Sequence, residues 1–243
     1  MTVFLTSSPT GALDGSYVVD GLDERNGFVS RLREVWPQDA RCLMITAFPD
    51  DIPASEEMTA FFASAVKKAG LSEECFELWD CRTQVPAAEE LQLYDVIFLG
   101  GGHVPTQNAF FARLGLREKL IGYKGIIIGI SAGSMNCADS VYAQPELPGE
   151  ALDPAYSRYL PGLALTDINV LPHYQMVKDY MRDGMRLFAD ITCPDCEGRK
   201  AVALPDGSYI LIRGEKTEVF GEAYRVLPYG MELLCREGES AAL

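Results

Sequence analysis

The amino-acid sequence predicts an α/β fold, with helices on both faces of a mostly parallel sheet and antiparallel strands near the C-terminus. Apolar runs of strand length alternate with amphipathic stretches between residues 3 and 130. The runs are apolar at successive positions, which is typical of parallel strands that are covered on both faces. Beyond residue 200, tight Asp-Gly and Gly-Glu turns join the strand-like segments, which indicates antiparallel pairing.

The predicted parallel strands are the apolar runs at residues 3–6, 42–47, 75–79, 96–99 and 126–130. The clearest helix is expected from near Ser55 to Gly70, because apolar side chains recur there at helical spacing: Met58, Phe61, Phe62, Ala65 and Val66. Glycine-rich turns follow two of the strands, at residues 100–102 and 129–131. Ligands of parallel sheets gather at the carboxyl ends of the strands, so both turns are expected at the binding edge.

The C-terminal part predicts an antiparallel meander that extends the same sheet or packs against one of its edges. Its strand-like segments are residues 201–204, 209–213, 217–220 and 224–227. No linker rich in proline, glycine or serine separates this part from the rest. We therefore expect residues 1–243 to form a single domain.

Composition narrows the class of protein. A formal net charge of −14 argues against nucleic-acid partners, which are bound by clustered lysine and arginine. No apolar run approaches the ~20 residues that span a bilayer, and the N-terminus lacks a basic segment, so we expect neither a membrane partner nor export. The seven cysteines are an odd number, which favours reduced thiols and a cytoplasmic location. Only Cys193 and Cys196 form a Cys-x-x-Cys pair, so no metal site and no cofactor is expected.

Ser131 is the first candidate for a catalytic nucleophile. It lies in Gly129-Ile130-Ser131-Ala132-Gly133, directly after an apolar strand and at the start of a predicted helix. Such a strand-to-helix bend exposes the serine, and the helix start offers a backbone N–H group to a developing oxyanion. The alternative is a glycine-rich turn that serves close packing only.

A serine nucleophile needs a base, and the chain contains two histidines, His103 and His173. His173 follows an apolar run and is expected at the rim of the sheet, which makes it the candidate base. His103 follows the triple glycine and is expected to line the substrate pocket. An acidic partner for the histidine is less clear from the residues, which leave open Asp206, Asp167 and Glu218.

Four motifs together resemble peptidase family S51, which contains aspartyl dipeptidase (peptidase E) and cyanophycinase. They are Gly100-Gly101-Gly102, Gly129-Ile130-Ser131-Ala132-Gly133, Pro172-His173-Tyr174 and Leu204-Pro205-Asp206-Gly207. The resemblance runs from about residue 43 to 212 and implies a fold similar to class I glutamine amidotransferases, which is flavodoxin-like. It implies Ser131 as nucleophile, His173 as base and Asp206 as acid, with the N–H groups of Gly102 and Ala132 as oxyanion hole.

The sequence departs from that family at its specificity residues. The dipeptidase has glutamate where this chain has Asp206, and asparagine where it has His103. Its preference for an N-terminal aspartate is associated with an arginine in a loop after the histidine. The nearby cations here are spaced by four, which would place them on one helix face: Lys178, Arg182 and Arg186. A solvated face is favoured for the set, and Arg182 is the residue expected to bind substrate.

The expected function is that of a cytoplasmic serine peptidase that hydrolyses small peptides, in the manner of a dipeptidase, through an acyl-enzyme. The alternatives are a non-catalytic protein that binds a small ligand, and an amidase or transferase on the same fold. The family's members are often dimeric, so a homodimer is an open expectation.

Overall fold

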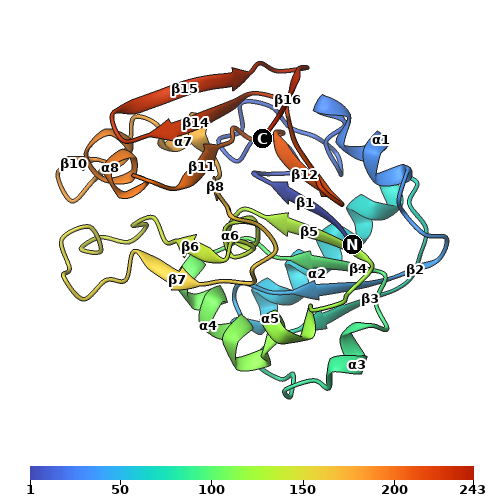
Figure 1. Cartoon of the computed structure of the whole chain (residues 1–243). Helices are drawn as coiled ribbons and strands as arrows, with labels where there is room; N and C mark the ends of the chain where they lie inside the picture. Colours follow the sequence, from blue (N-terminus) through green and yellow to red (C-terminus); the bar gives the residue numbers. More distant parts are fainter.

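The computed structural model describes residues 1–243, apart from the side chain of Ala88. Its main sheet has eight strands in the order β16-β13-β12-β1-β5-β4-β2-β3 (Figure 1). Five neighbouring strands are parallel: β1 (Thr2–Thr6), β5 (Ile126–Ile130), β4 (Val96–Leu99), β2 (Ala40–Ile45) and β3 (Glu73–Trp79). The other three are antiparallel: β12 (Tyr209–Arg213), β13 (Lys216–Phe220) and β16 (Ser240–Ala242). The predicted α/β class with a mostly parallel sheet is confirmed.

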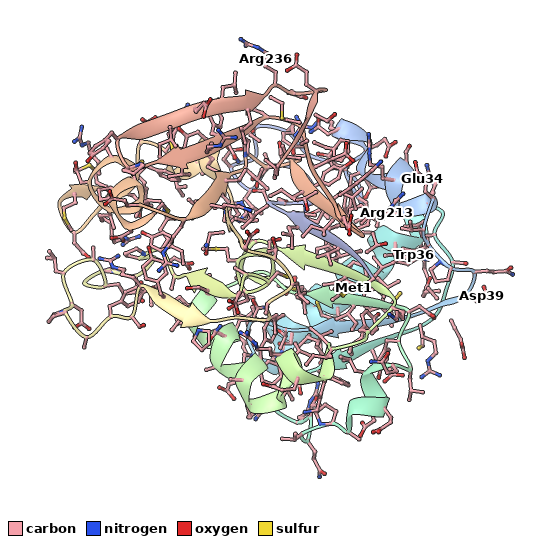
Figure 2. The ribbon with its side chains drawn as sticks, viewed as in Figure 1. Met1, Glu34, Trp36, Asp39, Arg213 and Arg236 are labelled. Carbon is pink, nitrogen blue, oxygen red and sulfur yellow. The ribbon has the colours of Figure 1, made fainter. Side chains whose placement is uncertain are left out.

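Different layers cover the two faces of this sheet. On one face, α1 (Phe28–Arg33) and α2 (Ile52–Lys68) bury Phe28 and Phe62 against Phe4 and Phe98 of the strands. On the other face lie α3 (Ala88–Leu91), α4 (Val104–Leu114) and α5 (Leu116–Lys119), together with a second sheet. Outside the core, Figure 2 shows Glu34 beside Arg213, an ion pair of 3.4 Å that joins the end of α1 to β12.

The second sheet has four strands in the order β15-β14-β11-β8, and Figure 1 shows it beside the main sheet. These strands are β8 (Ile168–Leu171), β11 (Lys200–Ala203), β14 (Ala223–Leu227) and β15 (Gly230–Cys235). β8 and β11 are parallel, whereas β14 is antiparallel to both of its neighbours.

The predicted antiparallel C-terminal strands are confirmed, and β12 and β13 extend the main sheet as expected, but the four strands do not form one continuous meander. The chain passes from β11 in the second sheet to the β12–β13 hairpin in the main sheet and then back to β14. Val202 and Ala223 of the second sheet and Ile210 and Val219 of the main sheet share one buried cluster. Apolar alternation predicts that these strands are buried, but it does not predict which sheet each strand joins.

The predicted helix near Ser55 is α2, and it begins earlier than expected. Asp51 caps it, because its carboxylate accepts a hydrogen bond of 3.1 Å from the N–H of Ala54. Phe61 lies outside the buried face, with 47% of its surface exposed. Ser55 and Thr59 lie on the buried face instead, where their hydroxyls donate hydrogen bonds to backbone carbonyls.

The remaining elements are short and lie in the segments between the strands and longer helices. They are η1 (Arg25–Gly27), α6 (Ala132–Met135), β6 (Ser140–Tyr142), β7 (Tyr159–Pro161), α7 (Tyr174–Val177), β9 (Met181–Arg182), β10 (Met185–Arg186), η2 (Leu187–Thr192) and α8 (Cys193–Asp195). Among the described residues, no helix has the length and apolar character needed to cross a bilayer.

The expected helix face of Lys178, Arg182 and Arg186 does not form. Lys178 is the C-cap residue of α7. Arg182 lies on β9 and Arg186 on β10, and these two strands pair antiparallel. The hairpin turn is Asp183-Gly184, with φ of 50° and 83°. This turn chemistry is a hairpin signal, and it overrides the spacing of four.

We expect Asp51→Ala to lower the free energy of unfolding by about 1 kcal/mol, because the first turn of α2 loses its side-chain acceptor. Urea unfolding measures the change. Asp50→Ala is the matched control, because the exposed Asp50 side chain accepts no hydrogen bond among the described residues. Equal effects of the two substitutions would contradict the capping role.

Candidate active site

The candidate site forms where strand ends from the two sheets meet. β1, β5 and β4 are neighbours in the main sheet, and their carboxyl ends lead to Ser7, Ser131 and the glycines at 100–102. β8 and β11 are parallel neighbours in the second sheet, and they lead to His173 and Asp206. His173 was expected at the rim of the main sheet, but it comes from the second sheet.

Ser131 has an unusual backbone conformation, with φ of 50° and ψ of −110°. Its N–H group donates to the carbonyls of Thr6 and Ser7, at 3.1 Å each, and α6 begins at the next residue. A Cβ atom at Gly129 would lie 2.8 Å from the Ser134 backbone, and one at Gly133 would lie 2.1 Å from the Leu99 carbonyl oxygen. Both glycines are therefore required, and the bend is the strained strand-to-helix turn that the sequence predicts.

The structure brings Ser131, His173 and Asp206 together. His173 Nε2 lies 2.8 Å from Ser131 Oγ, and His173 Nδ1 lies 2.7 Å from Asp206 Oδ1. The ionised carboxylate accepts a hydrogen bond from Nδ1–H, and this leaves Nε2 free to accept one from the serine hydroxyl. Of the two other carboxylates considered, Asp167 pairs with Lys200 on the surface and Glu218 lies on β13.

The Asp206 carboxylate is buried and accepts four hydrogen bonds. His173 and Ser7 Oγ donate to Oδ1, while the Leu13 N–H and Gln175 Nε2 donate to Oδ2. Burial by itself would raise the pKa of the Asp206 carboxyl, because it disfavours the charged form. The hydrogen bond and the positive charge of His173, together with the hydrogen bonds from Leu13 and Ser7, outweigh burial and hold this pKa below its ordinary value. Asp206 is therefore ionised at neutral pH.

Two backbone donors lie beside Ser131 without an acceptor. Within the part of the chain that the structure describes, the N–H groups of Gly102 and Ala132 donate no hydrogen bond. Gly102 has φ of 155°, and a Cβ atom there would come within 2.8 Å of Ala47 and Phe48. Only glycine fits this position, because both the backbone conformation and the close neighbours exclude a side chain.

A cavity of about 660 Å³ opens over Ser131 and His173 and is also lined by the expected substrate-binding residues, His103 and Arg182. Both ring nitrogens of His103 already have partners: Thr106 at 2.8 Å and Glu150 at 3.3 Å. Arg182 Nε is buried and has no hydrogen-bond partner among the described residues. Arg182 thus brings a positive charge to the wall of the cavity, and His103 forms another part of the same wall.

Several residues at the site were missed by sequence reasoning. Glu146 lines the same cavity, and nothing in its sequence context marks it. Gln175 accepts a hydrogen bond from the Asp206 N–H and donates to its carboxylate, which no motif indicates. Ser7 could have been found, because it follows an apolar strand in the same way as Ser131.

The Cys-x-x-Cys pair lies away from this cavity. Cys193 and Cys196 are buried in the cluster under α8 and η2, and each has a free thiol. No group of three or more histidine, cysteine, aspartate or glutamate side chains suited to a metal ion occurs in the described part of the chain.

Comparisons with known proteins identify the family of the chain. The model of Peptidase family S51 matches residues 50–220, which include Ser131, His173 and Asp206. No curated protein matches the chain. Among solved structures, a peptidase from an acI-B1 Actinobacterium is 15% identical, with a TM-score of 0.66 over 100% of this chain and 96% of that one.

A candidate peptidase E from Listeria monocytogenes EGD-e is also similar, with 19% identity and a TM-score of 0.57 over 90% of this chain and 96% of that one. At these identities the two structures support the fold, and the family match carries the relationship because it covers most of the sequence. The chain therefore belongs to peptidase family S51, a family of serine-type peptidases.

Proposed function

We propose that this peptidase hydrolyses small peptides, as a dipeptidase does, through a catalytic triad of Ser131, His173 and Asp206. The observation that carries the proposal is the pair of hydrogen bonds at 2.8 and 2.7 Å that links the three side chains in order. Nucleophile, base and orienting acid then have the geometry that acyl transfer requires.

In the proposed mechanism, His173 Nε2 takes the proton of Ser131 as Oγ attacks the scissile carbonyl carbon. The N–H groups of Gly102 and Ala132 donate to the oxyanion that develops. The ionised Asp206 stabilises the imidazolium of His173, which then gives its proton to the leaving amine. Water resolves the acyl-enzyme by the same steps, with His173 again as base, and no residue in this sequence of steps requires a cofactor.

The size and lining of the cavity support a small peptide as substrate. A volume of about 660 Å³ lies within the usual range of small-ligand sites, about 300 to 1,000 Å³. Phe48, Met58 and Leu187 form apolar walls, and Arg182 supplies a cationic donor for an acidic group of the substrate. We further propose that residues 1–243 act as one domain in the cytoplasm, where the cysteines stay reduced.

The first test is Ser131→Ala, assayed with dipeptides that vary in the first residue. We expect kcat to fall at least ~10³-fold with an unchanged melting temperature, because a triad member is lost while the core is intact. His173→Ala should match it, and the double variant should be no slower than either. A fluorophosphonate probe should label Ser131. Labelling of another serine, or activity in Ser131→Ala, would contradict the role of Ser131 as nucleophile.

The second test is Asp206→Asn, which should lower kcat by up to ~10⁴-fold. The asparagine amide donates where the carboxylate accepted, so it stabilises the imidazole tautomer that cannot accept the serine proton. Asp167→Asn is the control, because this exposed side chain pairs only with Lys200. Near-normal kcat in a folded Asp206→Asn protein would remove Asp206 from the triad.

A further inference from the structure

Outside the triad, Ser7 is the only described residue that is hydrogen-bonded to all three of its members. It follows β1 directly and is fully buried. Its carbonyl oxygen accepts the N–H of Ser131 at 3.1 Å. Its hydroxyl oxygen accepts the N–H of His173 and lies on Oδ1 of Asp206, at 2.7 Å each. A single residue at the end of the first strand therefore contacts the nucleophile, the base and the acid.

The Ser7 hydroxyl has one arrangement in this network. An ionised carboxylate only accepts hydrogen bonds and a backbone N–H only donates them, so Oγ donates its proton to Asp206 and accepts from His173. Oδ1 of Asp206 also accepts the Nδ1–H of the His173 ring at 2.7 Å. The ring is thus joined to this carboxylate oxygen directly, and the backbone of His173 is joined to it through Ser7.

The backbone of His173 needs such support, because it lies in the left-handed region with φ of 57° and ψ of 30°. Residues other than glycine adopt this region infrequently, and it persists where the surrounding structure holds it. The bond from the His173 N–H to Ser7 Oγ holds this peptide at the point where the chain leaves β8. Because rotation of the peptide would swing the ring, this bond also fixes the direction of the imidazole.

Ser7 is itself held by the segment that carries the acid. Its N–H donates to the carbonyl oxygen of Ser208 at 3.2 Å, and the Gly207 N–H donates to the carbonyl oxygen of Ser8 at 3.0 Å. The chain after β1 is therefore paired with the turn that follows Asp206. This pairing places the Ser7 hydroxyl beside the carboxylate before any substrate binds.

We propose that Ser7 is a positioning residue of the triad, which aligns His173 with the nucleophile and the acid and takes no proton itself. This inference rests on the proposed peptidase function. Leu13 and Gln175 also donate to Asp206, but they donate to Oδ2, and neither is hydrogen-bonded to another triad member among the described residues. Without the Ser7 hydroxyl, the His173 N–H loses its acceptor and Oδ1 loses a donor, so the ring loses its fixed direction.

The test compares Ser7→Ala and Ser7→Cys with the control Ser55→Ala. Ser55 is also fully buried, and its hydroxyl also makes two hydrogen bonds, to the Thr46 hydroxyl at 2.8 Å and the Phe48 carbonyl at 2.9 Å. It is hydrogen-bonded to no triad member. The two alanine variants should therefore lose similar amounts of stability in urea unfolding, and only one of them should lose activity.

Activity is measured with the best-cleaved dipeptide of the panel, well below the melting temperatures. Ser7→Ala should lower kcat by about 10- to 100-fold with little change in KM, because a misaligned base costs the chemical step and not substrate binding. Ser55→Ala should retain the kcat of wild type. Equal kcat values in the two alanine variants would reject the role of Ser7.

Ser7→Cys separates hydrogen bonding from packing. A thiol fills the volume of the hydroxyl, but it is a weak donor and a weak acceptor. The kcat of Ser7→Cys should therefore stay close to that of Ser7→Ala. A wild-type kcat in Ser7→Cys would mean that Ser7 only fills space, which would overturn the proposal.

The His173 ring gives a second readout that requires no catalysis. The chain has two histidines, so NMR of protein with isotope-labelled histidine shows two rings, and His173→Ala assigns them. In wild type and Ser55→Ala, the Nδ1–H proton should be observed, because Asp206 accepts it. In Ser7→Ala this signal should be lost to exchange with water, and an unchanged signal there would contradict the positioning role.

The two hypotheses fail in different ways. If wild type hydrolyses none of the peptides, the peptidase function is rejected, and the NMR comparison still decides whether Ser7 holds His173. If Ser131→Ala is inactive while Ser7→Ala retains both kcat and the ring signal, the triad stands and Ser7 is excluded from it.

Discussion

The buried carboxylate of Asp206 is the interaction on which the site depends. Its negative charge is stable away from water only because four donors surround it. These donors belong to His173 after β8, Ser7 after β1, Leu13 in the N-terminal loop and Gln175 in α7. The Asp206 carboxylate therefore links the two sheets and the N-terminal loop through hydrogen bonds. The bond to Nδ1 also fixes the orientation of the His173 ring.

The backbone of Ser131 is the second constraint. Its positive φ is held by hydrogen bonds from its N–H to the end of β1, and the flanking glycines allow the helix and β4 to approach closely. Strain of this kind persists where the surrounding structure determines it. It turns the serine toward the second sheet, where β8 delivers His173 at hydrogen-bond distance.

The cavity combines an apolar lining with a few fixed charges. Its walls come from segments that follow the strands, from the loop that carries Glu146 and from the β9–β10 hairpin, whose Asp183 accepts hydrogen bonds from that loop. These connecting segments carry Glu146 and Arg182, whereas the strands carry the core. Connecting segments tolerate changes of sequence better than the strands that form the core, which is consistent with a fold shared with solved peptidases at 15% and 19% identity.

The sequence by itself determined the five parallel strands, the α2 helix and the serine at its bend, because continuous apolar runs, helical spacing and paired glycines are local signals. The resemblance to the family added Asp206, which the residues alone left open beside Asp167 and Glu218. The tertiary structure decided which sheet each C-terminal strand joins, and it turned the segment of Arg182 into a hairpin. It also decided that Glu146 and Ser7 reach the site. Burial patterns specify that a residue is covered, but partners distant in the sequence are chosen only when the two sheets pack together.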